Sequence, residues 1–126
     1  MNEEIFLDAA ENGDLELVQE MLDKGVSPDT KDEHERTALY KAAKHGHLSI
    51  VKFLAEKGAD VDHRDNRGTT ALYWASANGH QDIVQYLIDH KSDVDVYDDR
   101  GWSAKDQATI HHHDVVVQIL NSAGAH

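Results

Sequence analysis

The pattern of apolar residues has helical spacing in two segments that lie 33 residues apart. In each segment, four apolar residues fall on one side of a helix of about ten residues, which is typical of a helix that buries one face. The first stripe comprises Ile50, Val51, Phe53 and Leu54, and the second comprises Ile83, Val84, Tyr86 and Leu87. We therefore expect amphipathic helices at about 48–57 and 81–90.

An alanine-rich helix is predicted just before each of these segments. Thr37 and Thr70 are suitable N-cap residues, because a side-chain oxygen can accept hydrogen bonds from the free amides of the first turn. Gly46 and Gly79 lie where each helix should end, since glycine readily adopts the left-handed conformation that closes a helix. The sequence therefore predicts helices at about 38–45 and 71–78.

The same features recur with a period of 33 residues along the chain. Gly13, Gly46 and Gly79 are spaced at this interval, and residues 37–40 and 70–73 both read Thr-Ala-Leu-Tyr. A fixed period of this size indicates a stacked repeat protein. Helices this short are marginal alone, so each must be stabilised by packing on the next repeat. The turn-rich segments 65–68 and 98–101 then predict short hairpins between the helix pairs.

Together these patterns predict an all-α solenoid of helix-turn-helix units with short hairpin fingers. We expect one domain at residues 1–126, with repeats at about 3–31, 32–64, 65–97 and 98–125, the first and last acting as caps. An elongated stack offers an open surface rather than a closed pocket, which favours recognition over catalysis.

Composition and charge narrow the classes of partner. The chain has no cysteine, which excludes disulfides and thiolate chemistry and fits a reducing compartment. The first twenty residues are acidic without an apolar core, and no apolar run approaches the ~20 residues of a membrane helix. We expect no signal peptide, no membrane span and a cytoplasmic or nuclear location.

The formal net charge of −12 disfavours binding to nucleic acid and to membrane surfaces. It favours a partner protein with a positively charged surface.

The repeated motif resembles that of the ankyrin-repeat family, which reads Asp-x-x-Gly-x-Thr-Pro-Leu-His-x-Ala-Ala-x-x-Gly-His, followed by Ile-Val, Leu and Gly-Ala. Residues 65–97 match it at Asp65, Gly68, Thr70, Leu72, Ala75, Gly79, His80, Ile83, Val84 and Leu87. Residues 32–64 match it at Asp32, Thr37, Leu39, Ala42, Ala43, Gly46, His47, Ile50, Val51, Leu54, Gly58 and Ala59. The resemblance covers about residues 3–125. It implies an ankyrin-repeat solenoid whose concave surface, formed by hairpin tips and inner helices, binds another protein.

Departures from the family motif carry structural expectations. The family histidine that ties neighbouring hairpins together is replaced by Tyr40 and Tyr73, and we expect tyrosine to tie them less well. Glu35 occupies the position of a hairpin glycine, so we expect a left-handed backbone there at a cost of about 1 kcal/mol. His112 replaces a helix-ending glycine, which suits a terminal repeat with a polar outer face.

The resemblance also implies which residues face a partner, because variable motif positions form the concave surface. The candidates are Arg36, Lys41, Lys44, Arg67, Trp74, Asn78, Tyr97, Arg100, Trp102, Ile110 and His111. Arginine beside aromatic side chains is the usual composition of an interface hot spot. We therefore expect Trp74, Trp102 and Tyr97 to anchor a protein partner. The alternatives are that the indoles only shield the stack and that the basic residues form an ordinary solvated face.

The sequence predicts no other chemistry. The run His111-His112-His113 lacks the spacing that places metal ligands on one helix face, so we expect no functional metal site and no cofactor. We recognise no motif for an activated nucleophile or a phosphate-binding loop, so we do not expect an enzyme. We expect a monomer or a weak homodimer. The alternative function is a self-associating or structural scaffold, including an engineered binding scaffold.

Overall fold

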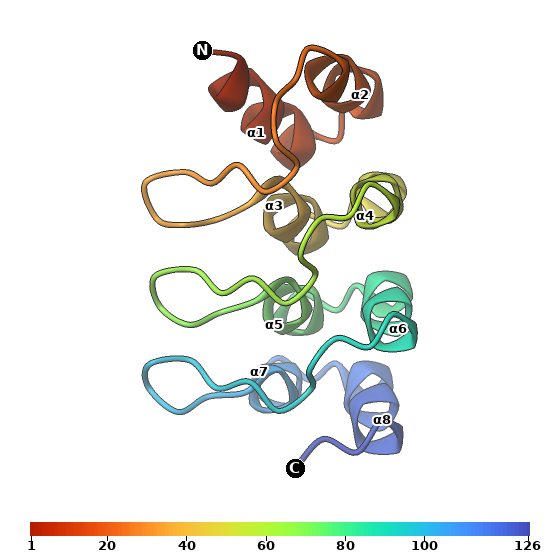
Figure 1. Cartoon of the computed structure of the whole chain (residues 1–126). Helices are drawn as coiled ribbons and strands as arrows, with labels where there is room; N and C mark the ends of the chain where they lie inside the picture. The colour runs from red at the N-terminus through yellow and green to blue at the C-terminus, as the bar shows by residue number, and fades with distance from the viewer.

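A computed structural model describes residues 1–126, which form eight α-helices arranged as four consecutive pairs (Figure 1). The helices are α1 (Asn2–Asn12), α2 (Leu15–Asp23), α3 (Ala38–Lys44), α4 (Leu48–Glu56), α5 (Ala71–Ala77), α6 (Gln81–Asp89), α7 (Ala104–Ile110) and α8 (Asp114–Ser122). The helices predicted at 38–45, 48–57, 71–78 and 81–90 each agree with the structure to within one residue at either end. The all-α solenoid is confirmed.

The helices stack in two parallel columns (Figure 1). The inner helices α1, α3, α5 and α7 form one column, and the outer helices α2, α4, α6 and α8 form the other. The loops before α3, α5 and α7 project as fingers from the side of the inner column that faces away from the outer column. The two termini lie at opposite ends of the stack. No helix is both long enough and apolar enough to cross a membrane.

The core lies between the two columns and continues through the whole stack. Ala42, Ala75 and Ala108 occupy the same position of successive inner helices and are completely buried, because small side chains let these helices pack closely. Leu54, Leu87 and Leu120 fill the equivalent position of the outer helices and are also completely buried.

The predicted caps are present at the inner helices. Thr37 Oγ1 accepts a hydrogen bond from the N–H of Tyr40, and Thr70 Oγ1 accepts one from the N–H of Tyr73. Gly46 and Gly79 follow α3 and α5 with φ of 82° and 75°. The left-handed region is therefore used where the sequence places glycine.

A histidine wedge joins each repeat to the one before it. The rings of His47, His80 and His113 lie against the glycines that follow α1, α3 and α5. Their Nε2 atoms lie 2.9, 3.1 and 3.1 Å from backbone carbonyl oxygens of residues 11, 44 and 77, within hydrogen-bonding distance. Each ring thereby satisfies a carbonyl that a helix end leaves without an intrahelical partner.

The fingers are closed by turns rather than by extended sheet. Isolated antiparallel bridges pair Lys31 with Thr37 and Tyr97 with Ser103. Glu35 has a φ of 63°, so the left-handed backbone expected there is confirmed, and His112 and Lys91 have φ of 61° and 68°.

An aspartate at the base of each finger organises its turn. Asp65 Oδ1 accepts hydrogen bonds from the N–H groups of Arg67 and Thr69, and Asp98 and Asp32 repeat this arrangement. The phenol of Tyr40 donates to Asp65 Oδ2 at 2.9 Å, and that of Tyr73 donates to Asp98 Oδ2 at 2.7 Å. Each tyrosine therefore ties its helix to the next finger, and its strength relative to the family histidine stays a prediction.

Candidate protein-binding face

Two adjacent hollows lie where the fingers meet the inner helices. The first, which we call the Lys44 hollow, has a volume of about 260 Å³ and is lined by His34, Arg36, Tyr40, Lys44, Asp65, Asn66, Arg67 and Trp74. The second, which we call the Trp102 hollow, has a volume of about 230 Å³ and is lined by Arg67, Thr69, Tyr73, Trp74, Asp98, Asp99, Arg100, Trp102 and Gln107. Arg67 and Trp74 belong to both linings, so they separate the two hollows.

Trp74 is a partly buried, fixed wall between the hollows. Its indole N–H donates to Thr69 Oγ1 at 3.0 Å, and its ring meets the edge of Tyr73 with centroids 5.2 Å apart. Lys44 Nζ lies 4.3 Å from the centroid of the indole ring, which is a cation–π contact. Trp74 therefore packs within the stack and also presents a face to the surface, so its two predicted roles are not exclusive.

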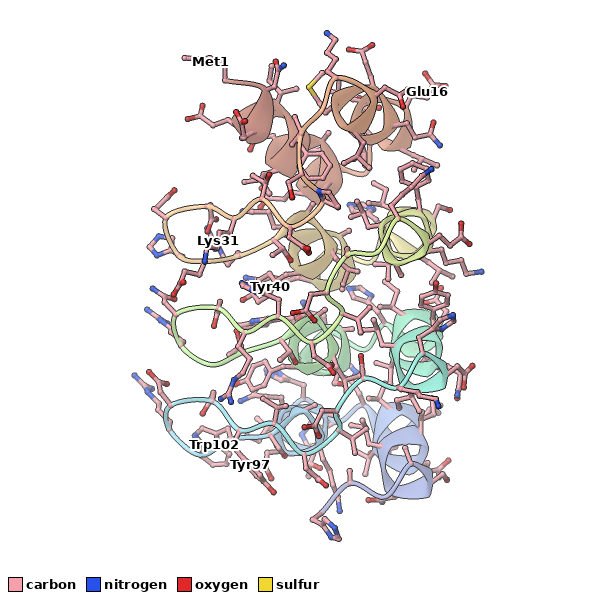
Figure 2. The ribbon with its side chains drawn as sticks, viewed as in Figure 1. Met1, Glu16, Lys31, Tyr40, Tyr97 and Trp102 are labelled. Atoms are coloured by element: carbon pink, nitrogen blue, oxygen red, sulfur yellow. The ribbon has the colours of Figure 1, made fainter.

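Trp102 and Tyr97 both belong to the last finger (Figure 2). Their exposed fractions are 44% and 43%, which is high for large aromatic side chains. The backbone beneath Trp102 is held in place, because its N–H donates to Asp98 Oδ1 at 2.9 Å. The interpretation that the indole of Trp102 merely shields the stack does not fit an exposure this high.

Positive charge dominates the Lys44 hollow. Burial, followed by the charge of Arg36, lowers the pKa of Lys44 below its usual value. The single carboxylate in the lining, that of Asp65, already accepts three hydrogen bonds from the protein. Arg36 Nε donates to Asp32 Oδ2 at 2.9 Å, outside the lining, so Lys44 and Arg67 are the cations of the hollow without an acidic partner.

The Trp102 hollow is more balanced in charge. Arg67 and Arg100 are exposed at its rim, and Asp98 and Asp99 also line it. Burial opposes the ionisation of Asp98, but hydrogen bonds from the N–H of Trp102, the phenol of Tyr73 and the N–H of Arg100 outweigh it and lower its pKa. Asp98 therefore stays ionised and is occupied by groups of the protein.

We expected Lys41 to lie on the open surface, but the structure buries it. It is only 8% exposed, and its Nζ lies 3.0 Å from Asp32 Oδ2 and 3.7 Å from Glu11 Oε1. The cause lies one repeat earlier: Leu7 stands at the register position of Tyr40 and Tyr73, so α1 has no phenol to donate to Asp32. Lys41 Nζ and Arg36 Nε, which donates to Asp32 Oδ2 at 2.9 Å, take the place of the phenol. The prediction of Lys41 as a partner contact is corrected.

The remaining candidates lie outside the two hollows. Asn78 is exposed, and its side-chain N–H donates to the carbonyl oxygen of Lys44 at 2.9 Å. Ile110 is 50% exposed at the end of α7, and His111 follows it at the surface. The structure therefore brings together Arg36, Lys44, Arg67, Trp74, Arg100 and Trp102.

Several lining residues were missing from the sequence prediction. Tyr40 and Tyr73 are not among the predicted partner contacts, although each lines one of the hollows. Gln107 was not singled out, although it stands 33 residues after Trp74 and therefore at the same position of its repeat. The 33-residue period therefore predicts that Gln107 lies at the same surface position as Trp74. Asp99 has no such signal, since acidic residues are common in all the fingers.

The comparison with protein-family models decides the family. The model described as "Ankyrin repeats (3 copies)" matches residues 6–98 and 68–126, which together span almost the whole chain. The chain belongs to the ankyrin-repeat family. Ankyrin repeats are generally protein–protein interaction modules and are typically non-catalytic. A search of curated proteins gave no match. No group of three or more histidine, aspartate or glutamate side chains in this ankyrin-repeat chain is arranged to hold a metal ion.

Proposed function

We propose that this ankyrin-repeat protein is a non-catalytic module that binds a protein partner through its fingers and inner helices, with the Lys44 and Trp102 hollows at the centre of the contact. The observation that carries the proposal is the placement of two tryptophans beside exposed arginines. Trp102 is 44% exposed, and Arg67 lines both hollows. Aromatic and arginine side chains are enriched among the residues that dominate binding energy.

The proposed module is a single domain of four repeats at about 3–31, 32–64, 65–97 and 98–125. Contacts between consecutive helix pairs support this division, since each inner helix packs on the next. The absence of cysteine supports a cytoplasmic or nuclear location.

The test is capture of partners from a cell extract by the immobilised protein. The double variant Arg67→Ala/Trp102→Ala should lose specifically captured proteins, because it removes a cation and an exposed ring from the proposed face. The matched control Lys52→Ala/Val115→Ala removes a cation and a 47% exposed apolar side chain from the outer helices, and it should capture the same proteins as the wild type. Equal capture by all three proteins would refute this face as the binding site.

Sedimentation at several concentrations tests the alternative of self-association. A dimer that forms with rising concentration and is abolished by Arg67→Ala/Trp102→Ala would make a second copy the occupant of this face. We expect a monomer or a weak dimer that the double variant does not alter.

A further inference from the structure

The two hollows occupy the same place in consecutive repeats and share one repeated basic position at the finger tips. His34, Arg67 and Arg100 follow one another at intervals of 33 residues, each near the tip of its finger. The fingers are held in step by backbone hydrogen bonds: the N–H of Asn66 donates to the carbonyl of His34 at 3.1 Å, and the N–H of Asp99 donates to that of Arg67 at 2.9 Å. A ligand that lies along the fingers would thus meet one basic side chain per repeat, an imidazole at His34 and guanidinium groups at Arg67 and Arg100.

The charge of this surface is opposite to that of the whole chain. The chain has a formal net charge of −12, yet the Lys44 hollow is lined by the cations Arg36, Lys44 and Arg67. Its one acidic residue, Asp65, accepts three hydrogen bonds from the protein. Arg36 Nε lies 2.9 Å from Asp32 Oδ2, whereas Lys44 and Arg67 have no carboxylate within ion-pairing distance. Burial and then the charge of Arg36 lower the pKa of Lys44 below its usual value. Charge complementarity therefore favours a negatively charged group in this hollow.

The aromatic walls favour a particular backbone shape for the segment that carries this group. Trp74 on α5 lines both hollows, and Trp102 on the last finger lines the second, so the second hollow has two indole rings in its lining. Grooves with aromatic walls bind extended segments rich in proline, because the polyproline II helix is already ordered and its rings pack on indoles.

The spacing of the repeats matches the pitch of that helix. Neighbouring helices pack about 8–10 Å apart, which sets the spacing of successive repeats. A polyproline II helix has three residues per turn and rises about 3.1 Å per residue, so identical side chains return to the same side after about 9.3 Å. An acidic residue at every third position would therefore stay in register with successive repeats.

We infer that the partner presents an extended, proline-rich acidic segment with an acidic side chain at every third residue, one in the Lys44 hollow beside Arg67 and the next beside Arg100. The intervening residues pack on Trp74 and Trp102. This inference rests on the proposed function and names the chemistry of the partner. Nucleic acid fits less well, since Asp98 and Asp99 line the second hollow and would face a continuous phosphate backbone.

The protein contains its own reporters for the test. Its two tryptophans are Trp74 and Trp102, so the two indole N–H signals in a ¹H–¹⁵N NMR spectrum each report on the proposed site. The probes are three synthetic peptides of equal length: (Pro-Pro-Glu)₄, (Pro-Pro-Gln)₄, and a peptide with the composition of the first in which the four glutamates are adjacent. The second removes charge without changing backbone preference, and the third removes the spacing.

We expect (Pro-Pro-Glu)₄ to shift both indole signals. It should bind about tenfold more tightly than (Pro-Pro-Gln)₄, as expected for charge-assisted hydrogen bonds, and more tightly than the peptide with adjacent glutamates. Arg67→Gln should weaken its binding about tenfold, because this side chain lines both hollows. The Lys52→Ala/Val115→Ala control should bind it as the wild type does.

Equal affinity for the glutamate and glutamine peptides, or indole signals that no peptide moves, would overturn the inference. If Arg67→Ala/Trp102→Ala nevertheless loses partners from the extract, the proposed function survives and only the partner's chemistry is wrong. Tighter binding of single-stranded oligo-dT than of (Pro-Pro-Glu)₄ would overturn the inference in favour of nucleic acid.

Discussion

The contact between Gly46 and His80 gives a sharp prediction about what holds consecutive repeats together. A Cβ atom added at Gly46 would lie 2.9 Å from Cε1 of His80, which is too close for either group to stay in place. Gly46 also has a φ of 82°, a conformation that residues with a Cβ adopt at a cost. Gly46→Ala should therefore strain the backbone and displace the ring.

The two costs can be estimated separately. A left-handed backbone costs a residue with a Cβ about 1 kcal/mol. Displacement of His80 loses its hydrogen bond to the carbonyl of Lys44, now 3.1 Å long, which contributes about 1 kcal/mol. The variant should thus lower the free energy of unfolding by about 2 kcal/mol. Gly58→Ala is the matched control, because φ is 89° there but no atom lies within 4 Å of the added Cβ. It should cost only about 1 kcal/mol.

Urea unfolding, followed by far-UV circular dichroism, measures the free energy of unfolding of both variants and of the wild type. The effect of alanine on the unfolded chain is common to both and cancels in the comparison. The double variant Gly46→Ala/His80→Ala completes a cycle, in which the cost of Gly46→Ala should fall to that of Gly58→Ala once the ring is gone. The contact between His80 and Gly46 would not stabilise the stack if Gly46→Ala and Gly58→Ala lowered the free energy of unfolding equally. The same conclusion would follow if Gly46→Ala cost as much without His80 as with it.

Three further predictions concern the first finger and the aspartates. Lys41→Met should lower the free energy of unfolding in urea by about 2 kcal/mol, because it removes the buried one of the two charged donors to Asp32 Oδ2 and leaves only Arg36 Nε, and an unchanged urea midpoint would contradict this. Glu35→Gly should leave the melting temperature unchanged or raise it by a few degrees, corresponding to about 1 kcal/mol of relieved strain, and a clear drop would be the opposite result. The pKa values of Asp32 and Asp98 are lowered in the folded state, so their stabilisation is present above the unfolded pKa of about 3.9 and is lost as pH falls from there through the folded values. Asp98→Asn should accordingly reduce the acid dependence of the urea midpoint, and an unaltered dependence would argue against it.

The sequence was sufficient for those parts of the fold that obey local rules. Thr37 caps a helix through its own side chain, and Gly46 ends it through its own backbone freedom, so neither needs knowledge of distant residues. The apolar stripe around Ile50 likewise follows from helical spacing alone. The 33-residue period then sets the order in which these local elements stack.

The candidate site was less predictable because its geometry depends on pairs of repeats. Lys41 has the sequence context of an exposed helix residue, and only the absence of a phenol at Leu7 explains why it turns inward to Asp32. The cation–π contact of Lys44 with Trp74 also joins neighbouring repeats. Such contacts follow from the three-dimensional stack, so the sequence predicts which residues are variable but not which of them meet.

The cationic hollows in an acidic molecule have a consequence for how fast a partner arrives. At about 0.01 M salt, where the Debye length is about 30 Å, a distant acidic segment is influenced mainly by the net charge of −12 and is repelled from most directions of approach. Attraction begins only close to Arg36, Lys44 and Arg67. Added salt would screen the long-range repulsion and so raise the association rate. It would also screen the short-range attraction and so raise the dissociation rate.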